Sequence, residues 1–240
     1  SPVITLPVYT NATAKRNTDN LTLNISITDA TVGLLNSSNS FCFINVNGTN
    51  QSIPLVNNWC NSTGIKLTGL TDGNKTITVY ANDTINNMGI NNSFAVLIDT
   101  TSPVITLPVY TNNTLKRNID LLTLNIFTVD AISSSSYCKF NINSGSNETI
   151  IHSNGWCNST TVSLSGLSDG IKVINVYAND TLGNWGLNSD YYVKIDTTSP
   201  VTNLYSPANG TFSSNSIQTL MFNLTDTNAL KNSTFYLWNS

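Results

Sequence analysis

Apolar and polar residues alternate with a period of two along most of the chain. In LTLNISITD at 21–29, every second residue from Leu21 to Ile27 is apolar. The same alternation recurs in TITVYAN at 76–82 and in SFAVLID at 93–99. A period of two is typical of half-buried strands in an antiparallel sheet, and no helical period of 3.6 competes with it. The pattern therefore predicts an all-β fold.

This pattern recurs along the chain at intervals of about 100 residues. The peptide SPVITLPVYTN begins at Ser1 and returns unchanged at Ser102, and a third start, SPVTNLYSPANG, follows at Ser199. A period this long indicates whole domains in tandem, because solenoid repeats are shorter. We therefore expect two complete repeats at 1–101 and 102–198, followed by an incomplete third repeat at 199–240.

Each complete repeat contains about seven strand-like segments. In the first repeat they are VITLPVY, LTLNISITD, FCFINVN, QSIPLV, GIKLTGL, KTITVYAN and SFAVLID. Turn signals such as Asn47-Gly48 and Asp72-Gly73 separate several of them. The count predicts tandem immunoglobulin-like β-sandwiches of about seven strands each, with a closed barrel as the alternative. The third repeat contains only VTNLYSP, IQTLMFNLTD and TFYLWN, which are too few to close a sandwich.

The run VYANDTLGNWGLNSDYYVKIDTTSP at 176–200 resembles the end of the tandem Ig-like repeats found in bacterial and archaeal surface proteins. In that family the last two strands typically read V-x-A-x-D-x-x-G-N, then an apolar strand, then D-x-T-x-P. The first repeat departs from this pattern, with NNM at 86–88 where the second has GNW at 183–185. The resemblance covers 1–198 and extends to the rest of the chain through its first strands. It implies an extracellular spacer, adhesin or surface-layer role without chemistry of its own.

The chain carries unusually few charges. Charged residues make up 10% of the chain, against roughly 25% in an ordinary soluble domain, and the net charge is −3. We therefore expect no nucleic-acid partner and no membrane contact within this segment. No apolar stretch is long enough for a transmembrane helix, and no signal peptide is recognisable. We interpret the chain as an excerpt of a longer protein or as a processed form, because it begins and ends within the repeat pattern.

Each complete repeat contains two cysteines. Strand alternation places the first of each pair, Cys42 and Cys138, on the inward face. Two cysteines in one small β domain predict a disulfide within each repeat, Cys42–Cys60 and Cys138–Cys157. Zinc is the alternative, but it needs four ligands close together, and the chain has one histidine. Disulfides favour an extracellular location at the cell surface.

The N-x-[ST] acceptor motif for N-linked glycans occurs 17 times, whereas this composition gives roughly 10 by chance. A glycan coat would replace charge as the solubilising feature, and the alternative is that the chain is simply rich in asparagine. The candidate residues are Asn11, Asn20, Asn24, Asn36, Asn47, Asn50, Asn61, Asn74, Asn82, Asn91, Asn112, Asn147, Asn158, Asn179, Asn209, Asn223 and Asn232.

Acidic residues recur in register between the repeats. Ig-like topology brings acids at the exit of one repeat towards acids at the entry of the next. At the first junction these are Asp72, Asp99, Asp130 and Asp180, and at the second they are Asp169, Asp196 and Asp226. Clustered oxygen ligands suit Ca²⁺, and the resemblance implies that some such repeats bind Ca²⁺ at their junctions. The alternative is that these acids only cap turns and bond backbone amides.

No catalytic arrangement is recognisable, because His152 has no partner motif and the acids fall at strand ends. The sequence therefore predicts a protein without enzymatic activity and without a cofactor beyond structural Ca²⁺ and N-linked glycans. The leading interpretation is a structural subunit of an extracellular filament, stalk or surface layer that self-associates into a homopolymer. The alternatives are an adhesin or carbohydrate-binding module on a cell-surface stalk, and an ancillary domain of a secreted enzyme. A strand from another subunit or from the same chain would complete the third repeat.

Overall fold

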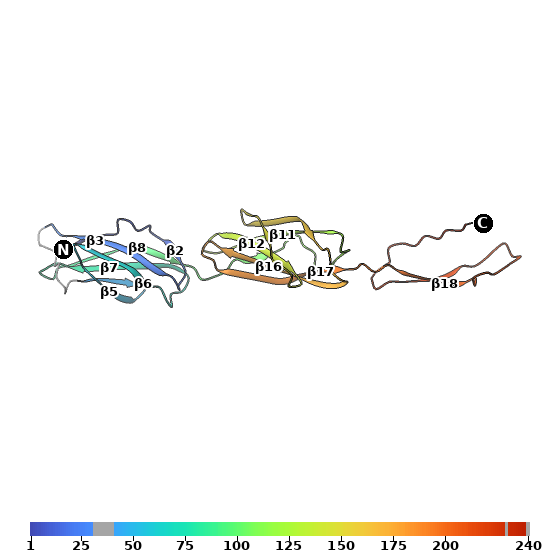
Figure 1. Ribbon diagram of the computed structural model, residues 1–240. Helices are drawn as coiled ribbons and strands as arrows, with labels where there is room; N and C mark the ends of the chain where they lie inside the picture. The colour runs from blue at the N-terminus through green and yellow to red at the C-terminus, as the bar shows by residue number, and fades with distance from the viewer. Residues whose placement is uncertain (31–40, 229, 239–240) are drawn as a thin grey trace.

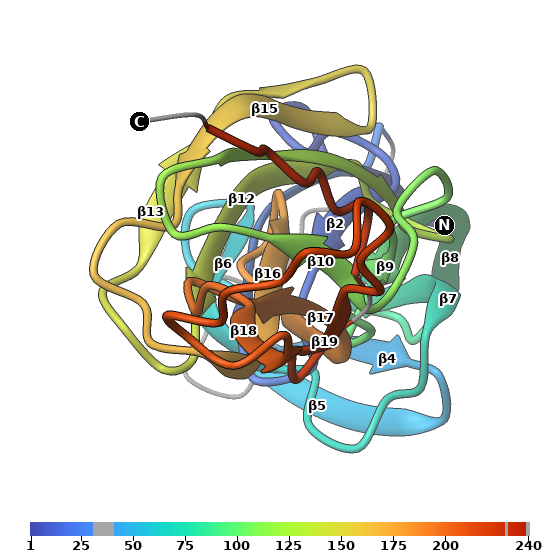
Figure 2. The same cartoon turned by 90° about the vertical axis from the view of Figure 1, so that its right-hand side faces the viewer.

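The computed structural model describes residues 1–30, 41–228 and 230–238 of the chain. Strands form two β-sandwiches in a row, followed by a two-stranded unit at the C-terminal end (Figure 1). Figure 2 looks along this row, with the third unit in front. The expected all-β fold of tandem Ig-like sandwiches is confirmed. Among the described residues there is no helix of the length and apolarity that spanning a membrane requires.

Repeat 1 packs a three-stranded sheet, β1-β3-β6, against a five-stranded sheet, β2-β8-β7-β4-β5. Its strands are β1 (Val3–Thr5), β2 (Thr13–Lys15), β3 (Asn20–Thr28), β4 (Phe41–Val46), β5 (Thr49–Pro54), β6 (Trp59–Lys66), β7 (Gly73–Asn82) and β8 (Met88–Ile98).

Repeat 2 has the same plan, with sheets β14-β15-β11-β9 and β10-β17-β16-β12-β13. Its strands are β9 (Val104–Thr106), β10 (Thr114–Lys116), β11 (Leu121–Val129), β12 (Ser135–Ile142), β13 (Glu148–Ile150), β14 (His152–Ser153), β15 (Trp156–Ser163), β16 (Gly170–Asp180) and β17 (Trp185–Ile195).

Two strands of each repeat differ from the sequence-based prediction. The first strand, expected at 3–9, ends early because the chain turns after Leu6. The chain then forms β2, a strand not expected from sequence, which joins the other sheet parallel to β8. The strand expected at 64–70 instead occupies 59–66 as β6 and includes the second cysteine. Beyond it the chain turns, with the Leu70 amide donating to the Leu67 carbonyl at 3.1 Å, and both leucines stay in the core.

The core of each sandwich lies between its two sheets. The alternating apolar positions of β3 and β11 are fully buried, as Leu23, Ile25 and Ile126 illustrate. A disulfide crosses each core, Cys42–Cys60 from β4 to β6 and Cys138–Cys157 from β12 to β15. Each therefore ties one sheet to the other, and in the chain-entropy view a loop of this length stabilises a domain by about 3 kcal/mol.

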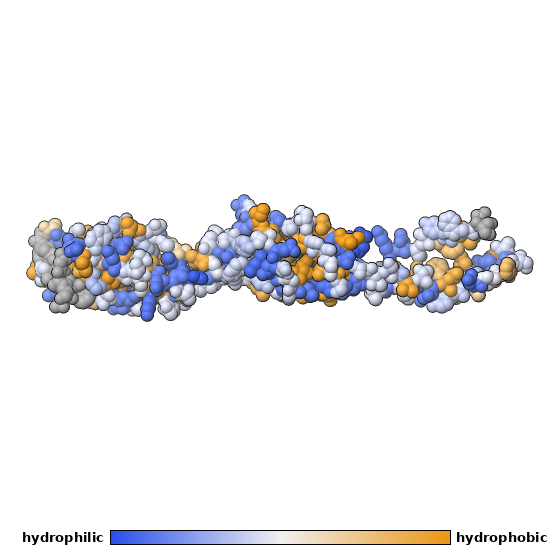
Figure 3. Space-filling view, viewed as in Figure 1, coloured by the Kyte–Doolittle hydropathy of each residue, from blue (hydrophilic) through white to orange (hydrophobic). Residues whose placement is uncertain are grey.

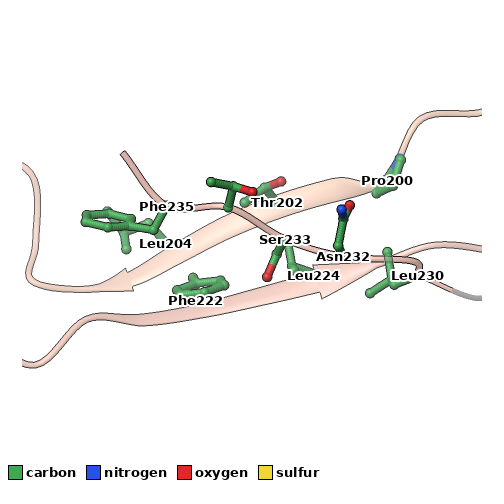
Figure 4. Close-up of a pocket in the computed structure, with 10 residues that line it drawn as sticks. Pro200, Thr202, Leu204, Phe222, Leu224, Leu230, Asn232, Ser233 and Phe235 are labelled. Carbon is green, nitrogen blue, oxygen red and sulfur yellow. The ribbon is translucent and has the colours of Figure 1, made fainter. Parts of the chain in front are cut away.

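The third unit is a hairpin of β18 (Val201–Ser206) and β19 (Met221–Thr225). The third strand expected in TFYLWN does not form over 234–238, because this segment makes no strand pairing with β18 or β19. Apolar side chains of the unit remain in solvent, with Leu204 59% and Phe222 43% exposed. Figure 3 shows apolar residues at its surface, and Figure 4 shows Leu204, Phe222 and Phe235 around a hollow of about 470 Å³.

Candidate cation site between the repeats

Three aspartates from two repeats meet at the first junction. Asp99 follows β8, the last strand of repeat 1, while Asp130 follows β11 and Asp180 ends β16. One carboxylate oxygen from each lies within 4.8 Å of the others. Asp99 is 0% exposed and Asp180 is 1% exposed. The exit of repeat 1 therefore contributes a buried acid to a cluster that repeat 2 otherwise builds.

A tight turn holds Asp180 in place. Its Oδ1 accepts hydrogen bonds from the backbone amides of Leu182 at 2.8 Å and Asn184 at 2.9 Å, and its Oδ2 accepts one from Asn184 Nδ2 at 2.7 Å. Burial alone would raise the pKa of Asp180, but these hydrogen bonds outweigh it and hold the pKa below its usual value. Asp180 is therefore ionised at neutral pH.

The other two carboxylates are anchored through one oxygen each. Asp130 Oδ1 accepts hydrogen bonds from the amides of Ile132 and Ser133, both at 2.9 Å. Asp99 Oδ1 accepts one from the Thr101 amide at 3.1 Å. The second oxygens, Oδ2 of Asp99 and of Asp130, are buried without a hydrogen-bond partner in the described part of the chain. Burying a carboxylate oxygen without a partner costs free energy of folding. A cation or a hydrogen-bond donor placed between these oxygens would offset that cost.

The cluster fits a calcium ion in size and chemistry. Ca²⁺ binds carboxylate oxygens at about 2.3–2.6 Å, so ligands on opposite sides of an ion lie about 5 Å apart. None of the ion pairs among the described residues involves Asp99, Asp130 or Asp180. A hollow of about 440 Å³, lined by Asp130, Ser133 and His152 among others, opens beside the cluster. The three acids therefore offer hard oxygen ligands without a paired positive charge among the described residues, and one of them, Asp130, lines the hollow.

The linker of the first junction is packed onto repeat 2. Asn184 Nδ2, which also bonds Asp180, donates to the Asp99 carbonyl at 3.3 Å. Nearby, the Pro103 carbonyl lies so close to Gly186 that a Cβ there would meet its oxygen at 2.6 Å. Only glycine permits this approach, so the chain path into repeat 2 is set by direct contacts.

Among the described residues, Asp72 and Asp169 do not join a cluster of acids, which corrects the expectation from sequence. Asp72 Oδ1 accepts hydrogen bonds from the amide and hydroxyl of Thr100, at 2.8 and 2.7 Å, and these hold its pKa below the usual value. Asp169 bonds Thr197 in the same way. Both acids instead fasten the exit segment of their own repeat, which is the capping role that the sequence left open.

The second junction also lacks a three-acid cluster among the described residues. Asp196 Oδ2 accepts a hydrogen bond from Asn228 Nδ2 at 2.5 Å, and Asp226 Oδ1 accepts one from the Asn228 amide at 2.7 Å. An asparagine side chain therefore occupies the place next to Asp196, and this junction does not reproduce the arrangement of the first.

The start of repeat 1 has the same local turn. Asp83 accepts hydrogen bonds from the Asn87 amide at 2.8 Å and from its side chain at 2.7 Å. Asp29, the counterpart of Asp130, lies 3.7 Å from the Ser1 amino group. Asn87 and Asn184 were not identified as positioning residues from sequence. Their recurrence four residues after Asp83 and Asp180 is the signal that points to them.

The candidate glycosylation sites differ in whether the side-chain amide of the asparagine already donates a hydrogen bond. Asn36 lies outside the described residues, and none of the other 16 asparagines is buried. Nevertheless, Asn91 Nδ2 donates to the Ile4 carbonyl at 2.8 Å and Asn112 Nδ2 to the Asp190 carbonyl at 2.8 Å. A glycan on either nitrogen would compete with these contacts, so exposure alone does not make the sites equivalent.

No family model matches the sequence, and no curated protein matches it either. Among solved structures it is similar to a tetra-tandem repeat from the extending region of a large adhesion protein, at 21% identity over 79% of this chain and 49% of that one, with a TM-score of 0.37. It is also similar to a Ca²⁺-stabilised ice-binding adhesin of an Antarctic bacterium, at 13% identity over 87% of this chain and 52% of that one, with a TM-score of 0.42. Fibronectin(III)-like modules of Clostridium thermocellum CbhA match at 15% identity over 80% of this chain and 93% of that one, with a TM-score of 0.33. The chain spans about half the length of the two adhesin structures.

Proposed function

We propose that this chain is a rod-forming segment of an extracellular or cell-surface structural protein, whose first junction is fixed by a bound calcium ion. The observation that carries the proposal is the placement of Asp99. This buried acid belongs to repeat 1, while its partners Asp130 and Asp180 belong to repeat 2. A cation held by all three joins the repeats, so binding energy resists bending of the rod.

An extracellular location agrees with the disulfides. Both connect two sheets within one repeat, and the described residues contain no free cysteine. Such bonds persist in oxidising compartments, where free Ca²⁺ is also abundant enough for millimolar to submillimolar sites. The fold offers repeating, rigid domains, and we assign it a mechanical spacing role without chemistry of its own.

Calcium titration followed by chelation tests the proposal. With free Ca²⁺ about 100-fold above its dissociation constant, the ion would stabilise the folded junction by about 2.7 kcal/mol. We expect EGTA to lower the melting temperature and to broaden the interdomain distance distribution in small-angle X-ray scattering. Asp99→Asn should abolish both responses. The exposed Asp190→Asn is the matched control and should keep them.

An identical melt and scattering profile with and without EGTA, in a chain freed of metal beforehand, would contradict the cation site. It would leave the three aspartates with the turn-capping role alone. A response that survives in Asp99→Asn would place the ion elsewhere in the chain. Asp196→Asn adds a further check, because Asn228 already occupies its carboxylate, and we expect this variant to keep the wild-type response.

We propose further that copies of the chain self-associate, as the sequence led us to expect. Support comes from the uncovered apolar face of β18 and β19, where Leu204 and Phe222 are exposed. Strands from a second copy that pair with the edge of β19 and pack across the hairpin as a second sheet would cover this face. Sedimentation velocity of the 1–240 chain should show concentration-dependent growth that Phe222→Asp suppresses. A chain that stays monomeric at every concentration would contradict self-association. The apolar face would then be covered by another segment of the same chain, and the adhesin interpretation would be favoured.

A further inference from the structure

The outer face of the five-stranded sheet of repeat 1 carries a shallow hollow of about 420 Å³. Its floor and walls come from β4, β5, β7 and β8 and consist of Phe43, Asn45, Asn50, Tyr80, Asn82 and Met88. Phe43 is 49% exposed and Met88 is 55% exposed. Large apolar side chains therefore line a polar-rimmed depression on a surface with few charges, and we call this depression the Tyr80 shelf.

Strand register places Asn82 at the edge of this shelf. Tyr80 and Asn82 are two residues apart on β7, so both side chains lie on the outward face of the strand. Across the sheet, Phe43 pairs with Tyr80 and Met88 pairs with Asn82. The amide of Asn82 is therefore flanked by an aromatic ring along its own strand and by a thioether across from it.

Asn82 is also chemically available. It opens the acceptor motif Asn82-Asp83-Thr84, its side chain is exposed, and it makes no hydrogen bond among the described residues. Asn50 lies in the same hollow, but its Oδ1 accepts a hydrogen bond from Asn45 Nδ2 at 2.5 Å. Of the two acceptor asparagines on the shelf, Asn82 is therefore the one whose side chain is not already held by a neighbouring side chain.

We propose that Asn82 carries an N-linked glycan whose first sugar packs on the Tyr80 shelf. A pyranose ring presents an apolar face of C–H groups, which suits the faces of Tyr80 and Phe43, while its hydroxyl groups can reach the amides of Asn45 and Asn50. The sugar covers apolar surface that the protein leaves in solvent, so the modification stabilises repeat 1 as well as solubilising it. This inference rests on the extracellular location in the proposed function.

Repeat 2 provides an internal comparison, because it covers the equivalent surface with its own side chain. Lys139 stands where repeat 1 has Phe43, and its Nζ lies 4.4 Å from the ring centroid of Trp185 and 5.2 Å from that of Tyr177. The corresponding acceptor, Asn179, already receives a hydrogen bond from the Ser136 hydroxyl at 3.0 Å. A glycan on Asn179 would find these aromatic faces occupied and would stabilise repeat 2 little.

The test uses the full chain secreted by a host that attaches N-linked glycans, with site occupancy read by mass spectrometry of glycopeptides. We expect Asn82 to be occupied, and we expect Asn82→Gln or Thr84→Ala to lower the melting temperature of repeat 1 by about 4 °C. Asn179→Gln should change the melting of repeat 2 by less than about 1 °C. Hydrogen exchange separates the two repeats where their transitions overlap.

A double-mutant cycle identifies the shelf as the cause. In a Phe43→Ala background, where the shelf is reduced, the loss caused by Asn82→Gln should shrink to less than half. Equal losses in both backgrounds would overturn the docking of the sugar. An unmodified Asn82 in a chain glycosylated elsewhere would overturn the proposal itself. A chain without any glycan would overturn the proposal but not the proposed function, which the calcium response tests independently.

Discussion

Ile126 in repeat 2 and Phe222 in the third unit occupy equivalent places, yet their surroundings are opposite. Each lies four residues before the aspartate that follows its strand, Asp130 or Asp226. Ile126 is 0% exposed, while Phe222 is 43% exposed. Both strands pair with the strand that opens their unit. The difference shows that an alternating strand only prepares an apolar face, and that burial requires a second sheet.

The two junctions differ for the same reason. The first combines Asp99 with Asp130 and Asp180, and Asp180 comes from the end of β16, late in repeat 2. The described part of the third unit has only two strands and no counterpart of β16, so Asp196 meets the amide of Asn228 instead. A complete sandwich is therefore needed to assemble the acids, although each of them is visible in the sequence.

The largest expected effect tests the contrast in burial directly. Ile126→Ala should destabilise repeat 2 by about 2–5 kcal/mol, because it leaves a cavity between the two sheets. Phe222→Ala should change unfolding little, since its side chain is already in contact with water. Chemical denaturation of the two variants measures the difference. Similar losses from both would mean that the third unit has a formed core.

Removing a disulfide should have the next largest effect. Cys138→Ser with Cys157→Ser should destabilise repeat 2 by about 3 kcal/mol, because the unfolded chain gains freedom. Reduction of the wild-type chain should affect repeats 1 and 2 alike and leave 199–240 unchanged, since that stretch has no cysteine. Differential scanning calorimetry with and without reductant provides the measurement, and a reductant-insensitive melt would contradict the prediction.

A glycine substitution probes the packed linker of the first junction. A Cβ at Gly186 would meet the Pro103 carbonyl oxygen at 2.6 Å, so Gly186→Ala should cost about 1–3 kcal/mol and displace the entry to repeat 2. Gly64→Ala is the control, because a Cβ there would meet nothing within 4 Å. Thermal unfolding and scattering should separate the two variants. If they behave alike, the linker adapts without loss.

The smallest effect is a response to acid that both junctions share. Hydrogen bonds from Thr100 lower the pKa of Asp72, and those from Thr197 and Thr198 lower the pKa of Asp169. A lowered folded pKa means that each contribution is present above the usual value of 3.8 and is lost as the pH falls through the lower folded value. Asp72→Asn with Asp169→Asn should flatten this part of the stability profile, which lies below about pH 4. An unchanged acid midpoint would count against the contribution.

Much of the candidate site follows from the sequence, and one part of it does not. Topology predicted that Asp99 would approach Asp130 and Asp180, and the structure brings them together. The same reasoning placed Asp72 in the cluster, where it is absent, because Thr100 follows β8 within hydrogen-bond reach and takes its carboxylate. The position of an aspartate along the chain determines at which end of the repeat it lies. The hydrogen-bond donors next to it determine whether its carboxylate joins the cluster or bonds its own repeat.

The sequence by itself determined the alternating strands, the repeat period and the pairing of cysteines, because each depends on local residue order or on spacing within one repeat. Tertiary structure decided the addition of β2 to the second sheet, the register that sets Asn82 beside Met88, and the three-acid contact across the junction. These features depend on which backbone segments hydrogen-bond and pack together. Such long-range pairing is a property of the folded chain, since residues far apart in sequence meet only when both sheets close over one core.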